Sequence, residues 1–251
     1  MNSKTTGRRN AEVPAPSSAQ GELECGECEA RSHCPGAGLS DEQLRGLHRI
    51  TQSRGPYPPG QAIFRIEDCF GALFVIQKGT VKIETTSRDG THLVDGFFFR
   101  GDMLGLEAIG DDRYRHDAVA LEPTWICELP YDQLESLCSF VPRLQHRILL
   151  LLAQKIRHTT HTIMHGRYLS AEQRVLQFLR MLCQKQIIQQ RDNQGSLLIP
   201  MSKGDIASYL GLRPESLSRA LSKLQEAGLI RNHGREIEFP DLIAIRRTIC
   251  D

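Results

Sequence analysis

The chain has 251 residues, and its 31 lysines and arginines nearly balance its 30 aspartates and glutamates, giving a formal net charge of +1. Whole-chain charge therefore excludes no partner and identifies none. No apolar run reaches the roughly 18 residues that cross a membrane, and residues 1–20 lack the apolar core of a secretion signal, so we expect no membrane association and a cytoplasmic location.

The chain divides into segments of different character. Residues 1–20 are rich in serine, proline and alanine and are predicted to form a flexible tail. A cysteine-rich loop occupies residues 21–40. In the region 41–138, short β-rich runs such as "ALFVIQKGTVKIETT" alternate with glycine turns. That spacing is typical of an antiparallel β-sandwich or barrel.

The hydrophobic period becomes helical in residues 139–168. Five side chains there step by 3, 4, 3 and 4, which is the spacing of an a/d seam about two heptads long. The pattern predicts a long dimerisation helix, with a helix packed on its own domain's core as the alternative. The predicted seam consists of Leu149, Leu152, Ile156, Thr159 and Ile163.

Residues 169–251 are assigned to a C-terminal domain. Ser202 is placed to cap a helix that ends near Gly211, and Pro214 stands where a second helix would begin. Two helices joined by a tight turn and followed by a strand pair around "GREIEF" predict a winged helix-turn-helix. A helical hairpin used for protein contact is the alternative.

The outer face of the second helix carries side chains that suit DNA. Arginine can bond both acceptors of guanine, and glutamate can accept from a cytosine amino group. Residues 199–235 hold six lysines or arginines against three acidic residues, a surplus that suits the phosphate backbone. The predicted DNA-binding residues are Glu215, Ser218, Arg219, Ser202 and Ser222.

Three cysteines, Cys25, Cys28 and Cys34, lie within ten residues of one another. Disulfides are uncommon in a reducing compartment, so clustered thiols predict a metal centre or a redox site. Tetrahedral zinc and a cubane cluster both take four ligands. The residues alone leave the fourth ligand open among Cys69, Cys127, Cys138, Cys183, Cys250 and His33.

From about Cys25 onward the sequence resembles the FNR branch of the CRP/FNR transcription regulators. The C-x2-C-x5-C spacing is similar to that family's iron-sulfur loop, and "GDMLGLEAIG" followed by "TWICELP" is similar to the segment with its fourth cysteine. The run "ESLSR" matches the family's E-x-x-S-R. The resemblance implies that Cys127 completes the ligand set with Cys25, Cys28 and Cys34.

The resemblance further implies an α+β protein with a β-roll sensor domain of the cyclic-nucleotide-binding jelly-roll type, a dimerisation helix and a winged helix-turn-helix. It implies a homodimer with a [4Fe-4S] cluster that oxygen breaks down. This dimer would bind double-stranded DNA at palindromic TTGAT half-sites and control genes of anaerobic metabolism. RNA polymerase is the implied partner for activation, with the turn "TSRDGTH" at 86–92 as a candidate contact.

Three alternatives are weighed against this reading. A cyclic nucleotide is not expected, because Leu106 stands where the nucleotide-binding branch has glutamate and Arg115 is followed by His116. The four cysteines could instead hold structural zinc. A redox enzyme of the C-x-x-C kind would need a thioredoxin-like βαβ pattern, which the sequence lacks. With no phosphate-binding glycine loop or nucleophile elbow, we predict that the chain is not an enzyme.

Overall fold

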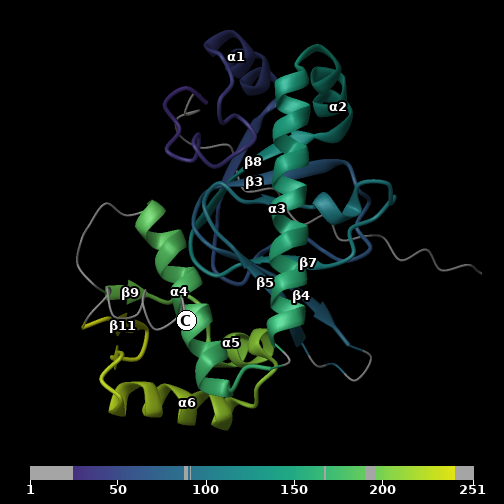
Figure 1. Cartoon of the computed structure of the whole chain (residues 1–251). Coiled ribbons are helices and arrows are strands. Elements are labelled where there is room, and N and C mark those ends of the chain that lie inside the picture. Colours follow the sequence, from purple (N-terminus) through teal and green to yellow (C-terminus); the bar gives the residue numbers. More distant parts are fainter. Residues whose placement is uncertain (1–24, 88–89, 91, 167, 190–195, 241–251) are drawn as a thin grey trace, which may run out of the picture.

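A computed structural model of the chain describes residues 25–87, 90, 92–166, 168–189 and 196–240. It confirms the predicted α+β architecture: a β-sandwich, a long helix beside it, and a C-terminal unit of helices and a small sheet (Figure 1). Of the helices in this described part, none combines the length and the hydropathy of a membrane-spanning segment.

Two antiparallel four-stranded sheets form the sandwich. One has the strand order β1-β8-β3-β6 and the other β2-β7-β4-β5. Alternate side chains of each sheet point inward, so Phe74 and Ile76 meet Val81 and Ile83 in one buried core. The strands are β1 (Gln52–Tyr57), β2 (Ala62–Phe64), β3 (Ala72–Lys78), β4 (Val81–Thr86), β5 (His92–Phe98), β6 (Met103–Leu104), β7 (Asp117–Ala120) and β8 (Thr124–Pro130).

Helices cover the outer face of the first sheet. Leu73 and Val75 of β3 point to this side and pack against Leu44 and Leu134 in a second core. The helix at 41–50 was not predicted from the sequence, although Ser40 and Gln43 form a capping box that indicates a helix start. The elements on this side are α1 (Asp41–Ile50), α2 (Tyr131–Phe140), the short 3-10 turn η1 (Leu106–Ala108) and α3 (Pro142–Gly166).

Helix α3 has two apolar faces. On one, Leu144 is fully buried and Ile148 and Leu151 pack on the core beneath it. On the other, Leu149 is 57% exposed and Ile156 is 64% exposed. Among the remaining residues of the predicted seam, Leu152 is half-buried, Thr159 is exposed, and the side chain of Ile163 lies outside the described residues.

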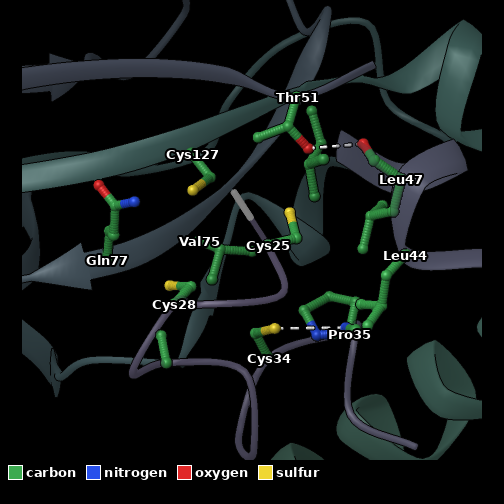
Figure 2. A pocket seen from close by; sticks show the side chains of 13 residues that line it. Cys25, Cys28, Cys34, Pro35, Leu44, Leu47, Thr51, Val75, Gln77 and Cys127 are labelled. Carbon is green, nitrogen blue, oxygen red and sulfur yellow. Dashed lines mark hydrogen bonds between the residues drawn. The ribbon is translucent and has the colours of Figure 1, made fainter. Parts of the chain in front are cut away.

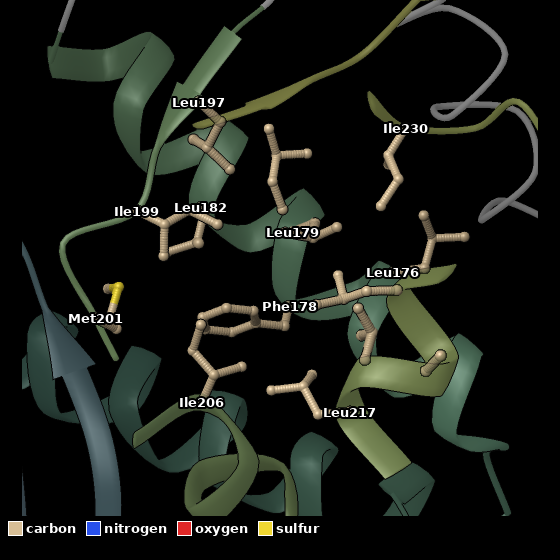
Figure 3. Close-up of a cluster of buried hydrophobic side chains, with 14 of the residues drawn as sticks. Leu176, Phe178, Leu179, Leu182, Leu197, Ile199, Met201, Ile206, Leu217 and Ile230 are labelled. Atoms are coloured by element: carbon tan, nitrogen blue, oxygen red, sulfur yellow. The ribbon is translucent and has the colours of Figure 1, made fainter. Parts of the chain in front are cut away.

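The C-terminal unit contains the predicted pair of short helices. Helix α4 (Ala171–Gln189) begins with the predicted capping box of Ser170 and Gln173. It is followed by β9 (Ser196–Leu198), α5 (Lys203–Leu210), α6 (Pro214–Glu226), β10 (Arg231–Asn232) and β11 (Glu236–Glu238), the strands pairing in the order β10-β11-β9. Leucines, isoleucines and Phe178 from these elements fill one core (Figure 3).

Candidate functional site

Four cysteines from two distant segments line one cavity. Cys25, Cys28 and Cys34 come from the loop before α1, and Cys127 comes from β8. Figure 2 shows their sulfur atoms turned toward the same space. The structure therefore gathers the three loop cysteines with the one distant cysteine that the family resemblance selected.

Strand pairing places Cys127 in this cavity. Cys127 lies opposite Val75 of β3 and Ser53 of β1, at the centre of the first sheet. Its neighbour Ile126 points into the core between the sheets, so the side chain of Cys127 points outward with that of Leu129. The cysteine loop covers this outer face.

Consecutive turns shape the loop. The carbonyl of Ala30 accepts hydrogen bonds from the amides of His33 and Cys34, both at 3.0 Å. The amide of Gly36 donates to the sulfur of Cys34 at 3.3 Å. A Cβ atom at Gly36 would lie 3.0 Å from the side chain of Leu44, so glycine allows this close approach.

Burial raises the pKa of three of the cavity thiols. Burial raises the pKa of Cys25, and it raises the pKa of Cys34 to about 11, against a smaller lowering by the Gly36 hydrogen bond. Burial and the neighbouring cysteines raise the pKa of Cys127 to about 12. Metal binding at this cavity must therefore release protons, because the metal ligand is the thiolate.

Contacts with α3 and with the turn after β5 help to fasten the loop to the rest of the chain. Arg147 of α3 donates to the carbonyl oxygens of Cys34 and His33, each at 3.4 Å. The turn after β5 forms the second contact: Arg100 pairs with Glu29, and a Cβ atom at Gly101 would lie only 2.5 Å from that of His33. The sequence carried no signal for either contact, because both join segments far apart in the chain.

The other candidate ligands lie elsewhere. Among the described residues, Cys69 is exposed, Cys138 is on α2 and Cys183 packs in the C-terminal core. The ring of His33 hydrogen-bonds Ser32 and does not line the cavity, and Cys250 lies outside the described residues.

The thiols do not converge on the position of one ion. Within the described ranges, no three histidine, cysteine or acidic side chains lie close enough together to hold a single metal ion. The soft sulfur donors nevertheless suit zinc or an iron-sulfur cluster, so the donor set fits the implied group.

The C-terminal unit holds α6 with its polar face outward. Gly211, with φ of +62°, ends α5, and the amide of Leu212 returns to the carbonyl of Ala207 at 2.9 Å. Leu217 and Ala220 are buried beneath α6. The predicted contacts Glu215, Ser218, Arg219 and Ser222 are all exposed on the opposite face.

Ser202 is the N-cap of α5, as predicted. Its hydroxyl accepts from the amide of Asp205 at 3.0 Å and donates to that residue's carboxylate at 2.6 Å. The side chain of Ser202 remains exposed beside Lys203. Backbone amides at a helix N-terminus can meet a phosphate, so Ser202 stays a predicted DNA-backbone contact.

Arg115 and His116, which stand where the nucleotide-binding branch of the family binds the cyclic phosphate, have other partners in this structure. Arg115 is exposed and pairs with Asp111 at 2.9 Å. Nδ1 of His116 lies 3.7 Å from Glu107 and Nε2 lies 3.7 Å from Asp95. The expectation that the chain takes no cyclic nucleotide stays a prediction.

The His116 contacts predict a pH-dependent stability. The carboxylate of Glu107 raises the pKa of His116 against the effect of burial, with Asp95 adding to the rise and Lys155 of α3 opposing it. Because the pKa of His116 is higher in the folded protein than in the unfolded chain, protonation of His116 stabilises the fold. This stabilisation is complete at pH values below the unfolded-state pKa of about 6.5, and it is lost as the pH rises through the folded-state pKa.

We expect His116→Gln to lose more unfolding free energy at about pH 5.5 than at about pH 8.5. Urea unfolding of both proteins under reducing, anaerobic conditions measures the difference. An equal loss at the two pH values would contradict the ion pair.

Comparison with known proteins gives a consistent assignment. Residues 54–139 match the cyclic nucleotide-binding domain and residues 173–248 match the Crp-like helix-turn-helix domain. The chain is 31% identical to the regulatory protein HlyX of Actinobacillus pleuropneumoniae over 86% of this chain and 89% of the relative. It is 29% identical to the fumarate and nitrate reduction regulatory protein of Escherichia coli K12, over 86% of each.

The fold has solved counterparts. FixK2 from Bradyrhizobium japonicum superposes with a TM-score of 0.69 at 24% identity, covering 79% of this chain and 96% of FixK2. The two family matches occupy the sandwich and the C-terminal unit in the same order as the described elements. The chain therefore belongs to the CRP/FNR family of DNA-binding transcription regulators and is not an enzyme.

Proposed function

We propose that this protein is an oxygen-responsive transcription regulator that binds palindromic TTGAT-type sites as a homodimer and controls genes of anaerobic metabolism. The observation that carries the proposal is the cavity lined by Cys25, Cys28, Cys34 and Cys127 in a chain that also presents a helix-turn-helix. The name of the fumarate and nitrate reduction regulatory protein of Escherichia coli supports the physiological assignment.

The four cysteines would hold a [4Fe-4S] cluster, which supplies a group that reacts with oxygen when it is bound. The chain's own residues supply the binding. Burial of Cys34 and Cys127 keeps water from the ligands, and the Gly36 amide favours the thiolate of Cys34.

The connection from the loop to the dimer would run through α3. Arg147 fastens α3 to the carbonyls of His33 and Cys34. Two residues farther along the same helix, Leu149 begins the exposed apolar face. A rearrangement of the cysteine loop would therefore change the contacts of α3, the helix that we assign to the dimer interface.

An anaerobic visible spectrum with iron and sulfide analysis tests the proposal. The wild type is expected to absorb broadly near 400 nm and to bleach in air. Cys127→Ala should abolish the absorption, because it removes one of four ligands, whereas the matched control Cys69→Ala should retain it, because Cys69 is exposed and outside the cavity. An air-stable spectrum, or one that survives Cys127→Ala, would contradict this function.

A colourless protein with stoichiometric zinc would support the alternative, a regulator of the same fold with a structural metal or with another redox or nitric oxide signal at the cysteines. Zinc has no visible absorption of its own. The DNA-binding assignment would stand, because it rests on the C-terminal unit. RNA polymerase contact remains a prediction, since three residues of the candidate turn at 86–92 lie outside the described residues.

A further inference from the structure

The C-terminal unit does not have a separate hydrophobic core. Val94, Phe97 and Phe99, from β5 and the turn after it, belong to the same buried cluster as the side chains of α4, α5 and α6. The ring of Phe97 lies 5.2 Å from that of Tyr209 on α5 and 5.8 Å from that of Phe178 on α4. The sensor sheet and the DNA-binding unit are thus packed as one body, and α5 lies against β4 and β5 in Figure 1.

Helix α5 also closes the edge of the sensor sheet. Strand β5 is the last strand of its sheet and, in the part of the chain that the structure describes, pairs with β4 alone. The hydroxyl of Ser208 accepts from the amide of Val94 at 3.0 Å and donates to the carbonyl of His92 at 3.3 Å. Because backbone groups at a sheet edge have fixed directions, these two bonds specify where α5 lies along β5.

Two ion pairs fix the same interface. Nζ of Lys82 on β4 lies 2.8 Å from Asp205 of α5 and 2.7 Å from Glu84, and all three side chains are at most 17% exposed. Lys185 of α4 pairs with Asp102, in the turn after β5, at 2.5 Å. Separating Lys82 from its buried partners would leave uncompensated charges, so this pair favours one arrangement over others.

Helix α6, the predicted recognition helix, is held in a fixed position relative to α5. Leu217 and Leu221 of α6 pack in the shared core, and the Glu172–Lys223 pair joins α6 to α4 at 2.7 Å. Arg174 of α4 donates to the carbonyl of Leu210, the last residue of α5. The direction of α6 relative to the sandwich is therefore set where α5 meets β4 and β5.

We propose that the β4–β5 edge positions the recognition helix, with Lys82 and Ser208 as positioning residues that set which half-site spacing the dimer accepts. This role rests on the proposed palindrome-binding function. One base pair of added spacer moves a half-site by about 3.4 Å and rotates it by roughly 35° around the duplex. Two recognition helices that are held at fixed angles to the sandwich cannot reach the displaced half-site. Recognition helices whose C-terminal unit is less firmly attached to the sandwich can reach it.

The test measures binding of the full chain, prepared anaerobically, to TTGAT palindromes with the cognate spacer and with one base pair added or removed. Wild type should prefer the cognate spacing, and Lys82→Met should reduce that preference by about tenfold. Ser208→Ala should act in the same direction with a smaller perturbation of folding. The control Lys78→Met removes an exposed lysine of β3 and should leave the preference unchanged.

A purely structural role predicts a different result. If Lys82 and Ser208 only stabilise the fold, their variants lose affinity equally at every spacing, and an unchanged preference overturns the proposal. Amide exchange at Val94 provides a readout without DNA: both variants should exchange faster there while the centre of β3 stays protected. Unchanged exchange at Val94 also overturns it. A wild type that binds no palindrome refutes the proposed function instead, and the positioning role falls with it.

Discussion

Arg219→Ala is expected to weaken binding to the cognate palindrome by about 1–3 kcal/mol for each half-site, and hence by about twice that for a dimer on both halves. Arg219 is exposed on the outward face of α6, while Leu217 and Ala220 hold the helix from beneath. If Arg219 bonds a guanine edge as predicted, its removal loses discrimination at one base pair and leaves the fold intact.

Titration of cognate and scrambled duplexes at one fixed salt concentration measures this effect, because charge removal alone weakens both. The matched control Arg45→Ala removes an exposed arginine from α1, outside the C-terminal unit. Arg219→Lys separates charge from geometry, since lysine keeps the charge but cannot present the two-pronged donor pair. A loss of the same size on scrambled DNA would show that Arg219 contacts only phosphate.

Ile156→Glu is expected to raise the dissociation constant of the dimer by at least about a hundredfold. Burying one isoleucine contributes about 1.5–3 kcal/mol, and two-fold symmetry removes the contribution twice. Ile156 is 64% exposed in the single chain, on the apolar face of α3 that does not pack on its own sandwich. The substitution also brings two like charges together across the axis.

Analytical ultracentrifugation of the anaerobic protein follows the change. Gln154→Glu is the matched control, because it adds the same charge to an exposed position of α3 about half a turn away from the seam. We expect the Gln154→Glu protein to dimerise as the wild type does. If both variants dissociate alike, or if Ile156→Glu stays dimeric, the interface lies elsewhere.

The parts of the fold that local signals determine could be predicted from the sequence. Ser202, Gly211 and Pro214 fix the ends of α5 and α6 through caps and backbone preferences within a few residues, and the observed helices begin and end where these residues indicate. The strands around "ALFVIQKGTVKIETT" followed from turn spacing in the same way.

Contacts between distant segments could not be predicted in this way. Cysteine spacing alone left the fourth cysteine open, because the position of Cys127 depends on the pairing of β8 with β3, about fifty residues apart in sequence. The two predictions for α3, a dimer seam or a core-packed helix, were posed as alternatives. In the structure Leu144 packs inward while Leu149 and Ile156 on another face remain exposed, so one helix has room for both roles.

The contact of Ser208 with the edge of β5 bears on the solubility of the protein. A bare strand edge offers unpaired amides and carbonyls to any other chain, and edge-to-edge pairing is a common start of aggregation. Helix α5 shields part of this edge at Val94 and His92. A sensor whose DNA-binding unit came loose would expose β5 together with Phe97 and Phe99. Docking of the DNA-binding unit therefore also covers backbone groups and aromatic side chains that would otherwise favour self-association.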